Sequence, residues 1–239
     1  MATVTDEWDL RIAPAGWGFL IWAVIYSLLG FFTVYQALSD ECAPNRNNHA
    51  IFNKAGWWVS VNFVLNAIWS PIFQSNNLLA FVISLIVCIG MLGTAIYILG
   101  VSLESRLSVS GLIGMRVGFS LYSGWLTVAT TLNIGFVLKA AGLNEEDANI
   151  DESFWAIGTL IAVFCVYTFV SFMQKNPAYS CVLEWALFAI VDKQFAYANI
   201  VQCATVLLIV NGCYIFWLAA WLAVDKTENA PKEMFGLFY

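Results

Sequence analysis

Aromatic side chains and asparagines recur at helical spacing in three apolar segments of the chain. The three stripes are Trp22, Tyr26, Leu29 and Thr33; Asn62, Asn66, Trp69 and Phe73; and Trp125, Ala129, Leu132 and Asn133. In lipid, Asn66 and Asn133 would leave amide groups unpaired, so both should point into the protein. Three such faces predict an aromatic cavity for a flat apolar ligand. The alternative is that the aromatic rings fill the core and the asparagines join neighbouring helices.

Groups that could carry out covalent or metal chemistry are scarce. His49 is the one histidine of the chain, and it is expected in a polar loop. No His, Cys, Asp or Glu cluster has metal-ligand spacing, and no nucleophile is paired with a base. The sequence therefore predicts a protein that is not an enzyme, that has no metal site and that requires no cofactor.

Glu184 is the one carboxylate well inside an apolar run. An ionised group there is costly, so it should be protonated, paired or exposed to water. A proton relay would need further acids or histidines at the centres of other segments, and we find none. The alternative is a carboxyl group hydrogen-bonded within the bundle. Lys193 is its nearest candidate partner along the sequence.

The composition places most of the chain in a membrane. Of 239 residues, 61% are hydrophobic and 11% are charged, which leaves too little polar surface for a water-soluble globule. A net charge of −6 without a basic run excludes nucleic-acid binding. Long apolar runs, rather than short alternating ones, favour spanning helices over a barrel. The expected surroundings are therefore a lipid bilayer.

We predict an all-α, polytopic membrane bundle of about seven transmembrane helices. The expected spans are about 16–38, 56–75, 78–101, 113–138, 154–174, 178–196 and 199–224. The second and third are separated by Ser75, Asn76 and Asn77 alone, which predicts an antiparallel hairpin. Gly114 and Gly118 form a GxxxG pattern, which predicts close helix contact within the bundle or between two protomers of a homodimer.

Lysine and arginine near the span ends predict the orientation of the chain. One side has Arg11, Lys139 and Lys193, and the other side has Arg46, Lys54, Arg106, Arg116, Lys175, Lys226 and Lys232. The side with more positive charge faces the compartment from which the chain inserts. The C-terminus is therefore expected on that side and the N-terminus across the membrane.

Motifs in the first four spans resemble the translocator / tryptophan-rich sensory protein (TspO/MBR) family. They read W-x-x-x-Y at Trp22 and Tyr26, N-x-x-W-x-P-x-F from Asn66 to Phe73, and W-x-x-x-A-x-x-L-N from Trp125 to Asn133. The resemblance covers about residues 14–140. It implies a four-helix core at 1–140. Residues 141–239 then add an acidic loop and three further helices, all in one compact bundle.

The resemblance also implies a site and a function. The tetrapyrrole- and drug-binding cavity of the family carries over to Trp22, Trp69, Trp125, Ala129 and Leu132, with Phe81 where the family often has tryptophan. Together with Tyr26, Asn66 and Asn133, these are the candidate ligand-binding residues. The expected ligand is a hydrophobic small molecule of the tetrapyrrole or sterol type, or a lipid, and the expected role is sensing or transport in an organellar, mitochondrial membrane.

A second hypothesis belongs to another functional class. The chain could be a non-catalytic accessory subunit of a larger membrane complex that keeps the fold without the function of the pocket. The three added helices favour this hypothesis, because other membrane-protein subunits could cover their lipid-facing surface. A third hypothesis is a seven-helix receptor. The last span contains no lysine for a Schiff base, which argues strongly against a retinal pigment and leaves only a receptor for another ligand.

Overall fold

The structure is a computed structural model that describes residues 4, 7–37, 49–103, 111–143 and 152–228. The elements in order are η1 (Gly16–Leu20), α2 (Ile21–Ala37), α3 (His49–Gln74), α4 (Leu78–Leu103), η2 (Leu112–Val117), α6 (Gly118–Ala140), α8 (Glu152–Met173), α9 (Pro177–Lys193) and α10 (Ala198–Glu228). The predicted all-α bundle is confirmed. The main difference is at α3, which begins at His49 rather than at about residue 56, because a helix can continue past the apolar stretch that marks the span.

Five helical segments in the described part of the chain are long and apolar enough to cross a membrane. They are Gly16–Tyr35, Leu78–Leu103, Leu112–Ala140, Glu152–Met173 and Ala198–Asp225. The two remaining long helices are α9, which has 17 residues, and α3, which has asparagines at positions 62 and 66. The chain is therefore an integral membrane protein, with α3 and α9 as its more polar or shorter helices.

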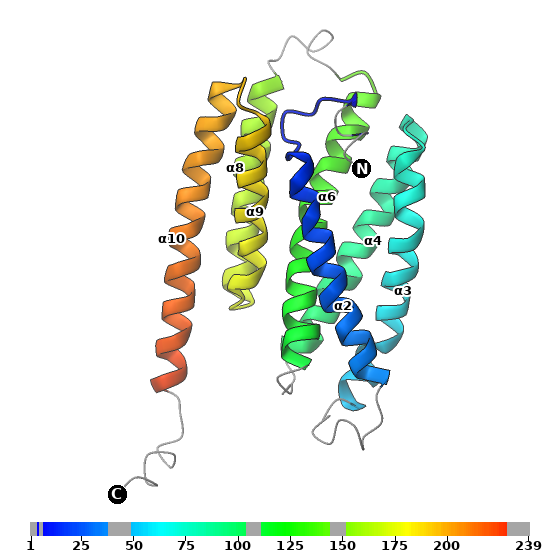
Figure 1. Ribbon diagram of the computed structural model, residues 1–239, viewed down its shortest axis with the longest axis vertical. Helices are drawn as coiled ribbons and strands as arrows, with labels where there is room; N and C mark the ends of the chain where they lie inside the picture. The colour runs from blue at the N-terminus through cyan, green and yellow to red at the C-terminus, as the bar shows by residue number, and fades with distance from the viewer. Residues whose placement is uncertain (1–3, 5–6, 38–48, 104–110, 144–151, 229–239) are drawn as a thin grey trace, which may run out of the picture.

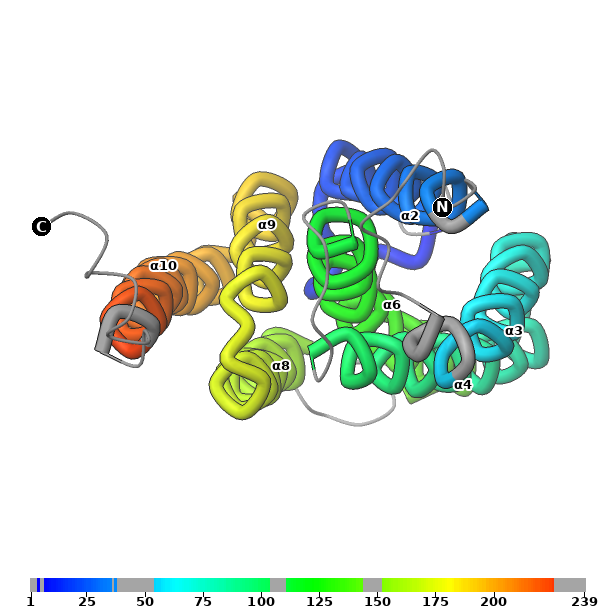
Figure 2. Tube along the Cα trace, turned by 90° about the horizontal axis from the view of Figure 1, so that it is seen from below, coloured from blue at the N-terminus to red at the C-terminus, as the bar shows by residue number. Residues whose placement is uncertain are grey.

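Helix α6 lies at the centre of the bundle, and α10 lies at its edge (Figures 1 and 2). In the membrane-spanning segment that contains α6, 61% of an apolar stretch of 18 residues is buried inside the protein. In α10 the buried share of such a stretch is 17%. Helix α6 packs against α2, α4, α8 and α9, whereas α10 packs against α8 and α9. The last three helices are thus joined to the first four mainly through α6.

The short connection between α3 and α4 forms the predicted antiparallel hairpin (Figure 1). Asn76 has a φ of 52°, a left-handed conformation that asparagine tolerates better than most residues. The Asn77 side chain then accepts a hydrogen bond from the Ala80 backbone N–H at 3.0 Å, which caps the start of α4. The local sequence therefore ends one helix and starts the next.

Glycines allow α6 and the segment before it to approach their neighbours closely. A Cβ atom on Gly114 would lie 3.0 Å from the Cβ of Phe32, and one on Gly118 would lie 3.4 Å from the Cβ of Leu28. The GxxxG pattern therefore packs against α2, which confirms the prediction of contact within the bundle. On another side of α6, Gly124 packs against α9.

Hydrogen bonds between buried polar side chains also join α6 to α8 and α9. Tyr167 of α8 donates a hydrogen bond to the Gly124 carbonyl. The hydroxyls of Tyr179 in α9 and Thr127 in α6 are 2.7 Å apart. Such bonds are favourable in lipid, because water is not available to pair the same groups. They fix the C-terminal helices on the central helix.

Candidate ligand-binding site

A small cavity lies between α2, α3 and α6. Its lining residues are Phe19, Trp22, Trp69, Phe73, Trp125, Ala129, Leu132, Asn133 and Phe136. Its volume is about 20 Å³, enough for about one water molecule. Pockets for drug-sized ligands measure roughly 300–1,000 Å³, so a tetrapyrrole or sterol would fit only if the lining rings moved apart.

Trp22 is the central ring of the cavity wall. Its ring centroid lies 6.0 Å from that of Trp69 on α3 and 6.4 Å from that of Trp125 on α6, where the rings are nearly perpendicular. The Phe19 ring meets Trp125 edge to face at 5.8 Å. Aromatic rings prefer such offset or edge-to-face contacts. Rings from three elements therefore converge on one space, as the stripes predict.

The wall of the cavity contains hydrogen-bond donors that have no acceptor. The indole N–H groups of Trp22 and Trp69 are buried and unpartnered within the described part of the protein. The two side chains are 8% and 3% exposed. A buried donor without an acceptor costs about 1–3 kcal/mol. Both rings line the cavity, and an acceptor that reached either N–H group would remove this cost.

The structure places the predicted site residues in two groups. Six of them line the cavity: Trp22, Trp69, Trp125, Ala129, Leu132 and Asn133. Tyr26 and Asn66 lie beside it, and Phe81 lies behind it, stacked on Phe136 at 5.4 Å. The three predicted tryptophans thus surround one space, while Tyr26, Asn66 and Phe81 support its wall from outside.

Tyr26 and Asn66 connect α2 to α3 next to the cavity. The Tyr26 hydroxyl donates to Asn66 Oδ1 at 3.0 Å, and Asn66 Nδ2 donates to the Tyr122 hydroxyl of α6 at 2.9 Å. The Tyr26 ring also stacks on Trp22 at 5.1 Å. The Asn66 amide is therefore used to hold three helices together.

Asn133 lines the cavity, but both polar atoms of its side-chain amide already have hydrogen-bond partners within the protein. Its Oδ1 accepts a hydrogen bond from the Ser84 hydroxyl at 2.7 Å, and its Nδ2 donates to the Ala129 carbonyl at 2.8 Å. Both predicted asparagines thus join helices. The unpartnered polar groups of the lining residues are instead the buried indole N–H groups of Trp22 and Trp69, which the stripe pattern does not distinguish from the rest of each ring.

Three phenylalanines of the cavity wall are absent from the predicted set. Phe73 belongs to the stripe of α3, and Phe136 continues the stripe of α6 four residues after Leu132. Phe19 precedes Trp22 by three residues and lies in η1. Helical spacing from the predicted tryptophans and Leu132 could therefore have found all three.

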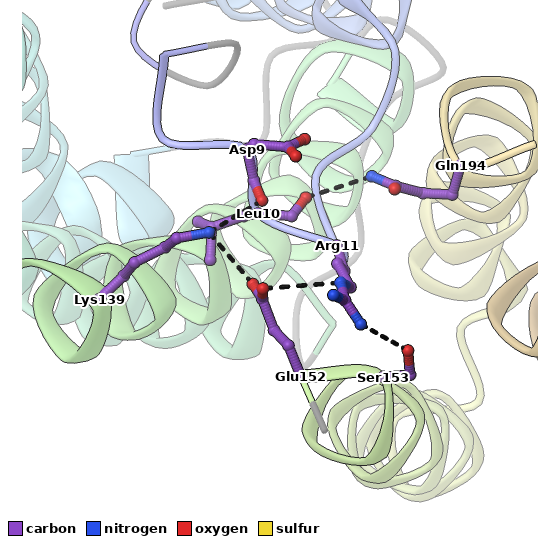
Figure 3. Close-up of polar contacts among 7 residues, drawn as sticks. All are labelled: Asp9, Leu10, Arg11, Lys139, Glu152, Ser153 and Gln194. Carbon is purple, nitrogen blue, oxygen red and sulfur yellow. Dashed lines mark hydrogen bonds and ion pairs between the residues drawn. The ribbon is translucent and has the colours of Figure 1, made fainter. Parts of the chain in front are cut away.

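Residues 7–15, which we call the N-terminal strap, cross the end of the bundle near the cavity (Figures 1 and 3). Lys139 of α6 donates to the Asp9 carbonyl at 3.1 Å and lies 3.3 Å from the Glu152 carboxylate. Glu152 also lies 3.5 Å from Arg11 Nε, and Arg11 donates to the Ser153 hydroxyl at 2.6 Å. One carboxylate of α8 therefore links the strap to α6.

Further contacts hold the strap against both halves of the bundle. Gln194, after α9, donates to the carbonyls of Leu10 and Ala13, each at 3.1 Å. Trp8 meets Phe81 edge to face at 5.4 Å. The Leu10 side chain lies 3.0 Å from where a Cβ of Gly135 would be. The strap thus covers the end of α6 and the aromatic rings beside the cavity.

Glu184 is paired across helices rather than along its own. Asn211 of α10 donates from Nδ2 to Glu184 Oε2 at 2.7 Å and to the Ser180 carbonyl at 3.1 Å. This bears out the alternative of a carboxyl group hydrogen-bonded within the bundle. Lys193, the nearest candidate along the sequence, is nine residues from Glu184, about two and a half helical turns away. A partner on another helix leaves no periodic signal in the sequence.

One of the comparisons with known proteins identifies a family. The family described as TSPO-like protein matches residues 1–219 of the chain. The match continues through α8, α9 and much of α10, beyond the segment of about 14–140 in which the motifs lie. Searches of curated proteins and of solved structures find no match. The chain belongs to the TSPO-like protein family.

Proposed function

We propose that this membrane protein binds a flat hydrophobic molecule of the tetrapyrrole or sterol type in the aromatic cavity, without catalysing a reaction. The observation that carries the proposal is the pair of buried, unpartnered indole N–H groups of Trp22 and Trp69 in a wall of aromatic rings. The rings offer stacking surface, and the N–H groups offer donors. A flat ligand with an acceptor at its edge would use both.

Binding requires the cavity to expand. The wall between α2 and α3 is formed by side chains, with the rings of Trp22 and Trp69 in tilted contact at 6.0 Å. Separation of these rings would enlarge the space. The ligand's stacking and hydrogen bonds then replace the ring contacts that are lost. We expect a change in tryptophan fluorescence on binding for this reason.

The test is titration of the purified protein with two porphyrins while tryptophan quenching is followed. Protoporphyrin IX has carboxylate acceptors, and etioporphyrin has alkyl groups alone at its edge. Trp69→Phe keeps an aromatic ring and removes the donor, so it should weaken protoporphyrin IX binding by up to about tenfold and change etioporphyrin binding little. Trp155→Phe, at an exposed position on α8, is the matched control for loss of one indole.

Trp125→Ala tests the stacking wall itself. Trp125 is 1% exposed and lines the cavity, so its truncation should weaken both porphyrins. Quenching curves that are the same for the wild type and Trp125→Ala would refute binding in this cavity. Equal losses for the two porphyrins in Trp69→Phe would refute the role of the indole donor.

The small volume of the cavity favours a second candidate function, that of a non-catalytic accessory subunit of a larger membrane complex. A space of about 20 Å³ holds no tetrapyrrole as it stands. Helix α10 also has much exposed apolar surface that another subunit could cover. If this function holds, protein solubilised from its native membrane migrates with a heavy complex, and the purified chain binds neither porphyrin.

The proposal extends to the role and location of the protein. We place it in an organellar membrane, mitochondrial by analogy with its family, with the strap across the membrane from the insertion side. There it would sense or transport the ligand. Accessibility of cysteines introduced singly at exposed loop positions to an impermeant maleimide, in intact organelles, tests the orientation.

A further inference from the structure

Both ends of the cavity along the bundle axis are closed by packed side chains. Toward the strap, the ring of Phe136 lies 5.3 Å from that of Phe73 and 5.4 Å from that of Phe81, and the strap covers Phe81. Toward the other end, Phe32 and Phe119 are 2% and 0% exposed and meet edge to face at 6.0 Å. A ligand moving along the axis would have to pass these buried rings.

Two of the three sides of the cavity are closed by helix packing. Helix α2 packs against α6 near Gly118, and α3 packs along α4, which in turn packs along α6. Among the described elements, α2 and α3 are not packed against each other along their length. They meet through side chains, namely the Trp22–Trp69 ring contact and the Tyr26–Asn66 hydrogen bond. This is the weakest wall of the cavity.

The side chains of this wall reach the surface that faces lipid. Tyr26 is 48% exposed, although its hydroxyl is bonded to Asn66 and its ring covers Trp22. Ile68, which precedes Trp69 on α3, is also exposed, at 42%. Tyr26 lies near the middle of Gly16–Tyr35, a segment long and apolar enough to cross a membrane, so this exposed part of the wall faces the acyl chains.

From this arrangement we infer that the ligand enters and leaves sideways from the bilayer, between α2 and α3, and that the Tyr26–Asn66 hydrogen bond holds this wall closed. The inference rests on the proposed function. Breaking the bond frees the Tyr26 ring to leave Trp22, and the Trp22 and Trp69 rings can then separate. Tyr26 is thus a positioning residue that sets the rate of exchange with the membrane rather than a contact that sets affinity.

The experiment measures binding rates by stopped-flow tryptophan quenching. The full chain is reconstituted in phosphatidylcholine vesicles and mixed with vesicles preloaded with protoporphyrin IX. Tyr26→Phe removes the hydroxyl and keeps the ring. It should raise both the association and the dissociation rate by about fivefold, the factor that corresponds to one ordinary hydrogen bond. The dissociation constant should change by less than about twofold, since the Tyr26–Asn66 hydrogen bond is broken during passage and is present in both the free and the bound state.

Two variants serve as controls. Ser27→Ala removes an exposed hydroxyl of α2 that bonds its own helix at Ala23, so its rates should equal those of the wild type. Glu152→Gln loosens the strap at the end of the bundle and should also leave both rates unchanged. If Tyr26→Phe does not fold, Asn66→Ala removes the same hydrogen bond together with the one to Tyr122, and it should raise both rates by at least as much.

The outcomes separate the route from the proposed function. Wild-type rates in Tyr26→Phe, or faster rates in Glu152→Gln alone, with protoporphyrin IX still bound, overturn the lateral route and leave the binding function intact. No binding by the folded wild-type chain overturns both. Faster rates in Tyr26→Phe at unchanged affinity, with both controls unchanged, support the route.

Discussion

Gly124→Ala tests the contact that joins the C-terminal helices to the central helix. An added Cβ would lie 2.9 Å from Val182 Cγ2, 3.0 Å from Val182 Cβ and 3.2 Å from the Tyr179 carbonyl oxygen. Valine is stiff, because it is branched at Cβ, and the carbonyl belongs to the backbone of α9. Neither neighbour can move aside alone, so α9 must shift away from α6. The same glycine also accepts the hydrogen bond from Tyr167.

The expected size of the effect follows from two opposing contributions. Overpacking of a well-packed core costs about 1–3 kcal/mol. Alanine in place of glycine inside a helix gains about 1 kcal/mol. Because the contacts are with rigid atoms, we expect a net loss of about 1–2 kcal/mol for Gly124→Ala. Gly93→Ala, in α4 with nothing within 4 Å of its added Cβ, should be neutral or stabilising by up to about 1 kcal/mol.

The assay is thermal unfolding in detergent, followed by tryptophan fluorescence. For a chain of this size, 1 kcal/mol corresponds to about 2–4 °C in Tm. Gly124→Ala should therefore melt several degrees below the wild type, and Gly93→Ala at or above it. Equal Tm values for the two variants would refute the close packing of α6 against α9.

Three further predictions concern other contacts. Phe81→Trp should lower stability by about 1–3 kcal/mol, because Phe81 is fully buried among other rings, whereas tryptophan at the exposed Phe154 should not; thermal unfolding measures both. Glu152→Gln should lower Tm slightly, by up to about 1 kcal/mol of stability, and the loss should shrink in high salt; equal losses at both salt concentrations would contradict the ion pairs. Tyr179→Phe should lower the free energy of unfolding by about 1 kcal/mol, because it removes the buried hydrogen bond to Thr127. A Tm equal to that of the wild type would argue against this hydrogen bond.

The helices and much of the cavity could be predicted from the sequence. Long apolar runs set the positions of the helices, and the spacing of Trp22, Trp69 and Trp125 placed each ring on an inward face. Spacing fixes the face of a helix but not the depth at which faces from different helices meet. Tyr26 and Asn66, on the same faces as Trp22 and Trp69, therefore lie beside the cavity rather than in it.

The contacts of the strap could not be predicted in this way. Several of them use backbone carbonyls of Asp9, Leu10 and Ala13, and a carbonyl carries no information about residue type. Arg11 could be recognised as a charge near a span end, but its partner Glu152 lies in a segment 141 residues later. Pairings of this kind depend on how the helices are arranged in three dimensions.

The strap also has a consequence for how the protein is made. Its partners Glu152, Gln194 and Tyr197, whose ring lies 4.6 Å under the Arg11 guanidinium, are synthesised long after it. The strap, which is synthesised before these partners, therefore lacks its contacts with them until α8 has inserted and α9 has been completed. A chain stopped after α6 would lack these three anchors and would keep only the contacts of the strap with α4 and α6, such as those with Phe81 and Lys139. The strap can therefore reach its full set of contacts only after the later helices are in place.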